Sequence, residues 1–213
     1  MGRPKVAILS TVGIVKAAIE ILDREGEDEF TLSRVADRLG VKTSSLYNHI
    51  RSKDELVELI REVVVAPIDT EAFKRLPWDQ AMLVWARSYR SAFAAHPNSI
   101  KLLSTRAIRA PIVLLMYEQE VSSMVEAGWP VEDCVPVINA IENFILGSVL
   151  DLVAPTVMID TDGRSDEVPL LTKAVKRDDG KRADGAFEIG LTALIDGFRM
   201  RLRSFVDSFD DCS

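Results

Sequence analysis

Cysteine and histidine are scarce in this 213-residue chain, which has two of each: Cys134, Cys212, His49 and His96. Two cysteines far apart in the chain do not make a disulfide framework, so we expect a protein of the reducing cytoplasm. The chain also lacks a nucleophile elbow, a phosphate-binding glycine loop, the spacing H-x-x-x-H and paired cysteines. We therefore expect no catalytic residue, no metal site and no cofactor.

Long apolar runs are missing as well, because none approaches the ~18 residues that a helix needs to cross a bilayer. Arg3 and Lys5 precede an apolar stretch, as they would in an export signal, but Lys16, Glu20 and Asp23 follow it directly. We therefore favour a cytoplasmic protein over an exported one, with no membrane partner.

A general excess of positive charge is also absent, since the formal net charge is −7. Residues 1–66 carry 10 Lys and Arg against 11 Asp and Glu, so most of the acidic excess lies in residues 67–213. This balance excludes a generally basic coat for nucleic acid, but it allows a local basic patch that depends on specific contacts. The candidate patch is Arg3, Lys5, Lys42, Arg51 and Lys53.

The stretch Thr31 to Leu56 has the pattern of two short helices joined by a tight turn. Thr31 is a good N-cap for a helix with one apolar face, made of Leu32, Val35, Ala36 and Leu39. Gly40 suits the left-handed conformation that ends such a helix. In the next segment Leu46 and Ile50 are spaced to point back at the first helix.

The other side chains of this second segment point away from the first helix: Lys42, Thr43, Ser44, Ser45, Tyr47, Asn48 and His49. They offer donors, acceptors and an aromatic ring, and no carboxylate lies between Lys42 and Lys53. Such a surface on a helix-turn-helix can read the major groove of DNA, whereas a solvated polar helix in a bundle is the alternative. We predict that these residues bind double-stranded DNA together with Thr31, Lys53 and an N-terminal arm that contains Arg3 and Lys5.

A third helix should follow at once, since Ser52 to Glu55 has the S-x-x-E pattern of a capping box. We expect this helix to run to about Val65 and to present Lys53 to phosphate in its first turn. Two interpretations of the N-terminal arm with Arg3 and Lys5 remain open: it binds in a DNA groove, or it is a disordered terminus.

The segment LSRVADRLGVKTSSLYNHIRSKDEL resembles the DNA-binding region of the tetracycline-repressor (TetR) family, through VADRLGV, LYNHI and SKDEL. The resemblance covers Ile14 to Ile60 and is weak elsewhere, although FEIGLTALIDGF resembles the closing helix of the family. It implies a ligand-responsive transcriptional repressor that binds a palindromic operator as a two-fold dimer and is released by a small-molecule effector. The tetracycline repressors bind a magnesium–drug complex through core histidines. Because this chain has only His49 and His96, we expect a different effector.

Helical periodicity continues through the remaining chain, and no segment alternates as a strand would. We predict an all-α protein with a three-helix helix-turn-helix domain over residues 1–66 and an effector-binding and dimerisation domain over residues 67–213. In the second domain we expect a connector over 67–77, helices over 78–95, 111–127, 131–153 and 185–206, and a loop over 154–184 with one turn near 170–175.

The helices at 131–153 and 185–206 are apolar on more than one face, which is typical of helices that also pack against a partner. The resemblance implies a homodimer through these two helices, and a monomer with a wholly internal core is the alternative. The resemblance also implies a cavity for the effector within the second domain. Its candidate contacts are Trp85, Tyr89, Phe93, His96, Arg106, Tyr117, Asn139 and Asn143. For each of them the alternative is an ordinary core position.

Two other functions remain open from the sequence. The chain could be a constitutive architectural DNA-binding protein without an effector, although such proteins are usually basic. It could also be an enzyme or sensor that retains the helix-turn-helix, in which case changes to the outward surface would not affect sequence-specific binding.

Overall fold

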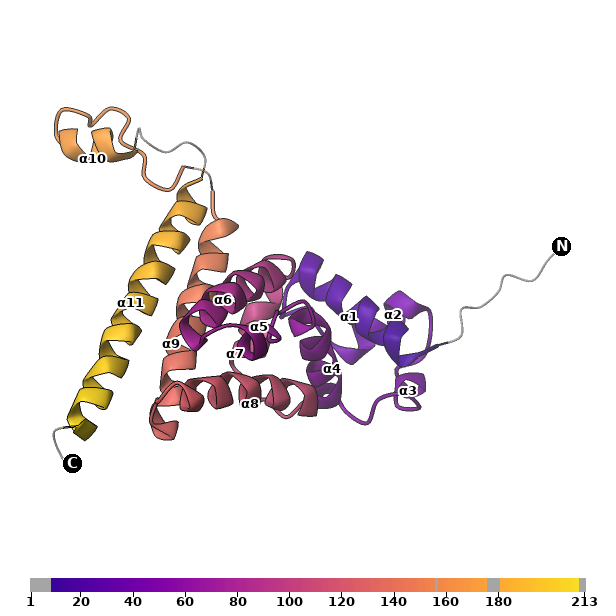
Figure 1. Ribbon diagram of the computed structural model, residues 1–213. Coiled ribbons are helices and arrows are strands. Elements are labelled where there is room, and N and C mark those ends of the chain that lie inside the picture. Colours follow the sequence, from indigo (N-terminus) through magenta and orange to yellow (C-terminus); the bar gives the residue numbers. More distant parts are fainter. Residues whose placement is uncertain (1–8, 156, 176–180, 211–213) are drawn as a thin grey trace. The chain divides into compact units, whose positions relative to one another are not determined.

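The computed structural model describes residues 9–155, 157–175 and 181–210, with side chains described as far as residue 205. Every regular element in these ranges is a helix, so the all-α prediction is confirmed (Figure 1). The chain divides into two compact units, residues 1–68 with 91–118 and residues 69–90 with 119–213. Because these units interleave along the sequence, the predicted domain boundary after residue 66 stays a prediction.

The first unit is built on short helices: α1 (Thr11–Glu25), α2 (Leu32–Leu39), α3 (Thr43–Leu46), α4 (Lys53–Val65), the 3-10 turn η1 (Pro97–Ser99) and α7 (Ile100–Ser104). Ser10 caps α1 by accepting a hydrogen bond from the Gly13 amide at 3.2 Å. The core of this unit contains Ile14, Leu22, Leu46, Leu56 and Ile60, each at most 1% exposed. The three-helix packing expected for a helix-turn-helix is therefore present.

The second unit contains α5 (Ala72–Arg75), α9 (Val131–Leu152), α10 (Pro169–Val175) and α11 (Arg182–Asp210). Two further helices, α6 (Trp78–Ala94) and α8 (Pro111–Glu126), each begin in one unit and end in the other along the chain. The predicted helices agree with these bounds within four residues. The connector prediction for 67–77 was incomplete, since it did not include α5.

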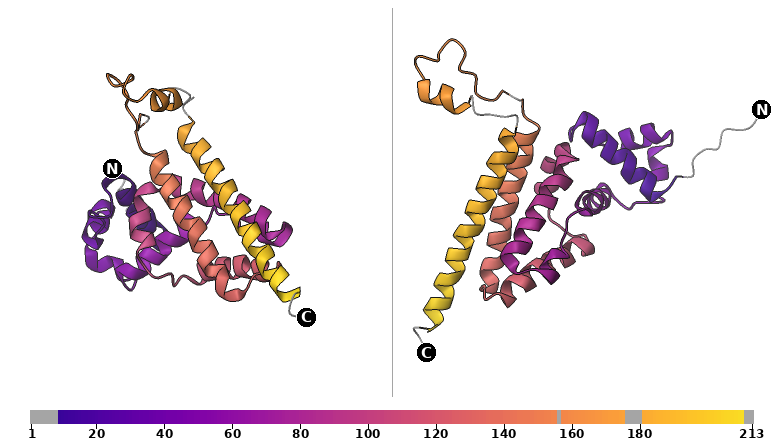
Figure 2. Two further views of the ribbon diagram at one scale, coloured as in Figure 1. Left: turned by 90° about the vertical axis from the view of Figure 1, so that its left-hand side faces the viewer. Right: turned by 45° about the horizontal axis from the view of Figure 1, so that its top comes forward.

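Helices α9 and α11 lie side by side over most of their length (Figures 1 and 2). Ile141 and Ile145 of α9 and Leu191 and Ile195 of α11 are fully buried in this unit. The Phe144 and Phe187 rings stack with centroids 5.6 Å apart. A Cβ at residue 190 would lie 2.5 Å from the Phe144 ring, so any larger residue there requires this ring to shift.

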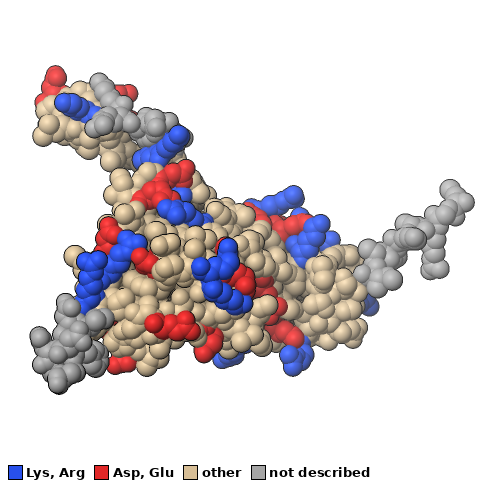
Figure 3. Space-filling model, in the orientation of Figure 1, with Lys and Arg blue, Asp and Glu red and all other residues tan. Residues whose placement is uncertain are grey.

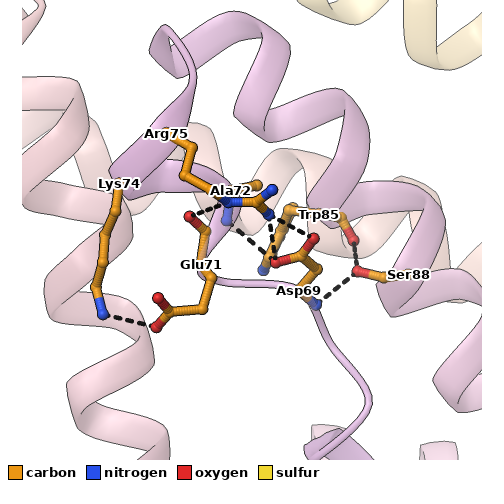
Figure 4. Close-up of polar contacts among 7 residues, drawn as sticks. All are labelled: Asp69, Glu71, Ala72, Lys74, Arg75, Trp85 and Ser88. Carbon is orange, nitrogen blue, oxygen red and sulfur yellow. Dashed lines mark hydrogen bonds and ion pairs between the residues drawn. The ribbon is translucent and has the colours of Figure 1, made fainter.

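Polar contacts fix α5 against α6 beside Trp85 (Figure 4). Asp69 caps α5 by accepting from the Ala72 amide at 3.1 Å and receives Arg75 at 3.1 Å. The Asp69 amide donates to the Ser88 hydroxyl at 2.9 Å, and this hydroxyl donates to the Trp85 carbonyl at 2.8 Å. The loop that precedes α6 is thus held in one conformation by groups that satisfy each other.

Helix α9 contradicts the expectation that no apolar run approaches bilayer length. Among the described residues, α9 is the one helix that is long enough and apolar enough to cross a membrane, judged by length and composition only. That expectation was therefore wrong. The core helices of globular proteins meet the same criteria. Only 28% of its apolar stretch is buried within the chain, so much of the apolar surface of α9 is left uncovered.

Candidate nucleic-acid interface

The turn between α2 and α3 has the geometry that the sequence predicts. Thr31 accepts a hydrogen bond from the Arg34 amide at 3.2 Å, which caps α2. Gly40 is left-handed, with φ of 67°, and its amide and that of Val41 close the end of the helix on backbone carbonyls. Val35 and Ala36 are fully buried, so α2 is fixed on its apolar face.

Helix α3 is a single turn, and hydrogen-bonded turns continue it as far as Ile50. The amides of His49 and Ile50 both donate to the Leu46 carbonyl, at 2.9 and 3.0 Å. Leu46 and Ile50 are 0% and 1% exposed, which confirms that they anchor the segment. The spacing of these two residues therefore decides which side chains face outward.

The outward side chains lie on the surface as expected. Lys42, Ser44, Tyr47, Asn48 and His49 are exposed, and Thr43 and Ser45 are half-buried. Tyr47 is 54% exposed, although an aromatic ring of a folded domain is usually packed. A row of hydroxyl, amide, imidazole and phenol groups can form hydrogen bonds with base edges and phosphates. Their contacts with DNA remain a prediction.

Lys53 has a further role that the sequence did not indicate. Its Nζ donates to the Phe30 carbonyl at 2.7 Å and lies 4.8 Å from the centroid of the Phe30 ring. Lys53 therefore ties the start of α4 to the loop before α2, and only its remaining N–H groups are left for a phosphate. Replacing Lys53 would consequently change both the fold and any contact with DNA.

Most other basic side chains close to this surface are paired with carboxylates. Arg38 contacts Glu20 at 3.0 Å, and Arg51, whose side chain is 89% exposed, contacts Glu55 at 3.0 Å. On the molecular face that Figure 3 shows, blue groups likewise lie beside red ones. Within the described chain Lys42 has no ion pair. Lys42 is therefore a better candidate for a phosphate contact than its paired neighbours. Arg3 and Lys5 lie outside the described residues.

Helix α4 is held to the segment that joins α7 and α8, which we call the α7–α8 connector (residues 105–110). The Glu58 carboxylate accepts from the amides of Arg109 and Ala110, both at 2.8 Å. Arg61 is only 5% exposed and donates to the carbonyls of Leu103 and Arg106, at 3.0 and 3.3 Å. Asp54 and Arg106 form an ion pair at 3.1 Å. Burial alone would raise the pKa of Glu58, but the two amides and Arg61 hold it below its usual value.

A cavity of about 540 Å³ lies between α4 and this connector. It is lined largely by charged side chains, among them Arg51, Asp54, Glu58, Glu62 and Arg109. The sequence contained a signal for the buried contacts of Arg61. This residue follows Val57 by one helical turn and therefore falls on the buried face of α4. A charged residue at that position requires polar partners inside the fold.

The predicted effector residues are divided between the two units, and their role in one effector site stays a prediction. His96 lies against Asp23, with Nδ1 3.0 Å from a carboxylate oxygen, and Arg106 pairs with Asp54. Phe93 and Tyr117 also belong to the first unit. In the second unit Trp85 is buried against Tyr89, with ring centroids 5.2 Å apart, whereas Asn139 and Asn143 are exposed on α9.

Sequence reasoning missed Glu120 on α8, which is 3% exposed. It precedes the buried Met124 by four residues, so the pattern already placed it on the inner face of the helix. Burial raises the pKa of Glu120 well above 4.5, Glu142 raises it further, and a hydrogen bond from Trp85 opposes the shift.

Comparison with known proteins connects both parts of the chain to one family. Residues 14–60 match the profile described as bacterial regulatory proteins, tetR family, and residues 75–202 match the tetracyclin repressor-like C-terminal domain. The class A tetracycline repressor from transposon 1721 of Escherichia coli is 29% identical over 194 residues, which span 88% of this chain and 89% of the repressor.

Solved structures share the fold. A TetR variant from Acinetobacter baumannii AYE in complex with minocycline has a TM-score of 0.69 at 23% identity and covers 91% of this chain and 98% of its own. BioQ with its double-stranded DNA operator has a TM-score of 0.59 at 22% identity, with 89% and 97% covered. Since the C-terminal profile alone spans more than half of the sequence and the helix-turn-helix matches separately, the chain belongs to the tetracycline-repressor (TetR) family of bacterial regulators.

Proposed function

We propose that this protein is a cytoplasmic, ligand-responsive transcriptional repressor, and not an enzyme, that binds a palindromic operator as a homodimer and is released by a small-molecule effector. The observation that carries the proposal is the exposed, carboxylate-free surface of residues 42–49, which Leu46 and Ile50 anchor to the core. Related proteins support it, since one solved relative contains minocycline and another contains its DNA operator.

The uncovered faces of α9 and α11 support the homodimer. Ile189 and Met200 on α11 are 75% and 68% exposed, and Val135 and Leu150 on α9 are 47% and 55% exposed. Apolar residues on the outer side of two packed helices lose their exposure when the same pair from a second copy packs against them. A dimer also presents two copies of the surface of residues 42–49, which we call the reading surface. Two copies together bind DNA more tightly than one copy binds a single half-site.

The contacts around α4 supply a means of response. Helix α4 directly follows residues 42–50, which we call the reading segment, and is held by Glu58 and Arg61 to α7 and the α7–α8 connector. We infer that effector binding moves this connector, and that α4 then changes the distance between the two reading segments of the dimer. Loss of the operator spacing would release the DNA.

Selection of bound sequences from a pool of random duplexes tests this proposal. The full-length protein should enrich a palindrome whose half-site centres lie about 10 base pairs, or a multiple of that, apart. Repeating the selection with candidate metabolites should identify one that abolishes enrichment. A protein that stays monomeric at micromolar concentration, or shows no preference among duplexes, would refute the proposal.

A further inference from the structure

Glu120 has an unsatisfied carboxylate oxygen in the interior of the second unit. Glu120 is only 3% exposed, and its Oε2 atom has no hydrogen-bond partner among the described residues. A buried acceptor without a partner costs free energy, and folded proteins contain few of them. Such a group therefore indicates a missing partner.

One aromatic side chain and a second acid act directly on this carboxyl group. The Trp85 side chain hydrogen-bonds to Glu120, and Glu142 from α9 acts on it electrostatically. The Tyr89 ring meets the Trp85 ring edge-on at 5.2 Å, and Phe73 meets Trp85 edge-on at 6.4 Å. Phe73 belongs to α5, and the Asp69–Ser88 hydrogen bond ties the start of α5 to α6 (Figure 4).

Two arginines of α6 form ion pairs with carboxylates other than Glu120 in the same unit. Arg87 pairs with Glu188 at 2.7 Å, and Arg90 pairs with Asp184 at 2.6 Å while it stacks over Phe187. The described groups that act on Glu120 are Glu142 and Trp85, and neither is a cation. Among the described residues, the groups that act on Glu120 thus include no positive charge, and the Trp85 ring connects Glu120 to the Phe73 and Tyr89 rings.

We propose that Glu120, Glu142 and the Phe73–Trp85–Tyr89 cluster form a recognition site for an organic cation, a protonated or quaternary amine with an apolar body. A cation over aromatic faces is stabilised by the ring quadrupoles, most strongly where water is excluded. The free oxygen of Glu120 supplies the opposite charge or accepts a hydrogen bond from the ammonium group. This inference rests on the proposed function, because the cation would be the effector.

Calorimetric titration of the full-length protein at moderate salt tests the site. The probes are two organic cations of different size, benzyltrimethylammonium and tetraphenylphosphonium, with tetraphenylborate as the size-matched anion. At least one cation should bind about tenfold or more tightly than tetraphenylborate, which corresponds to about 1.4 kcal/mol. Glu120→Gln should weaken that cation at least tenfold, whereas Glu126→Gln, on the exposed end of the same helix, should not change it.

The variants also separate this inference from the proposed function. Glu120→Gln keeps the size of the side chain and should bind the selected operator as the unaltered protein does when no cation is present. Equal affinity for cation and anion, or unchanged cation binding in Glu120→Gln, would overturn the site while leaving the repressor proposal intact. Failure of the unaltered protein to select any duplex would instead overturn the proposed function.

Discussion

The reading surface and the Glu120 site are built in opposite ways. The reading surface, residues 42–49, lies within one continuous stretch, residues 31–53, in which Val35, Ala36, Leu46 and Ile50 are buried and most polar residues are exposed. The Glu120 site draws on α5, α6, α8 and α9, and its polar group is the one that is buried. A surface for a large partner can be encoded locally, whereas a site for a small ligand requires tertiary packing to bring distant residues together.

The contacts of Arg61 show how strongly tertiary packing constrains a buried charge, and we expect its removal to have the largest effect on stability. Arg61→Ala leaves the Leu103 and Arg106 carbonyls without their donor and leaves Glu58 without its cation. We expect the free energy of unfolding to fall by about 3 kcal/mol. Urea denaturation followed by circular dichroism measures it. Arg51→Ala, which removes an exposed pair, should cost much less than Arg61→Ala. Equal losses in the two variants would show that the buried contacts contribute little.

Lys42 tests the electrostatic part of the reading surface. Because Lys42 has no ion pair in the described chain, its removal should not disturb the fold. Lys42→Ala should weaken operator binding by about 1–3 kcal/mol and reduce the slope of log K against log salt by about 1. Fluorescence anisotropy at several salt concentrations measures both. Lys74→Ala, which removes a lysine paired with Glu71, is the control and should change neither quantity. An unchanged slope in Lys42→Ala would exclude a phosphate contact.

Gly190 tests how closely the two long helices must approach. A methyl group at this position would overlap the Phe144 ring, which is itself stacked on Phe187. Gly190→Ala should lower the free energy of unfolding by about 1–2 kcal/mol, since the strain exceeds the gain in helix propensity. Gly185→Ala has open space around the added atom and should stabilise by about 0.5 kcal/mol. If Gly190→Ala were also stabilising, the packing of α9 on α11 described above would be incorrect.

Glu120 gives the subtlest effect, a change in the pH dependence of stability. Its pKa in the folded protein is raised, so the folded state holds the proton more tightly than the unfolded state does. Relative to Glu120→Gln, the unaltered protein should lose stability as pH rises above 4.5 and through the raised pKa. Urea denaturation of both proteins at pH 5 and pH 8 measures this. A difference in stability that is the same at both pH values would mean that Glu120 titrates normally.

The sequence predicts the first unit better than the second for physical reasons. Caps, the turn glycine and the spacing of Leu46 and Ile50 act within a few residues, so their outcome is visible in the chain itself. Arg61 and Glu120 also left a signal, because both are charged residues at core-facing helical positions. Their partners come from other elements, and no local pattern identifies them. Asn139 and Asn143 are exposed on α9 in the single chain, and their place in the effector site stays a prediction.

The most direct test of the central claim compares two proteins on two duplexes. The unaltered protein and the double variant Tyr47→Ala, Asn48→Ala are titrated against the selected operator and against a scrambled duplex of equal length. We predict that the unaltered protein prefers the operator and that the double variant, still dimeric, binds both duplexes with the same weak affinity. A double variant that keeps its preference for the operator would contradict the assignment of residues 42–49 as the surface that reads DNA.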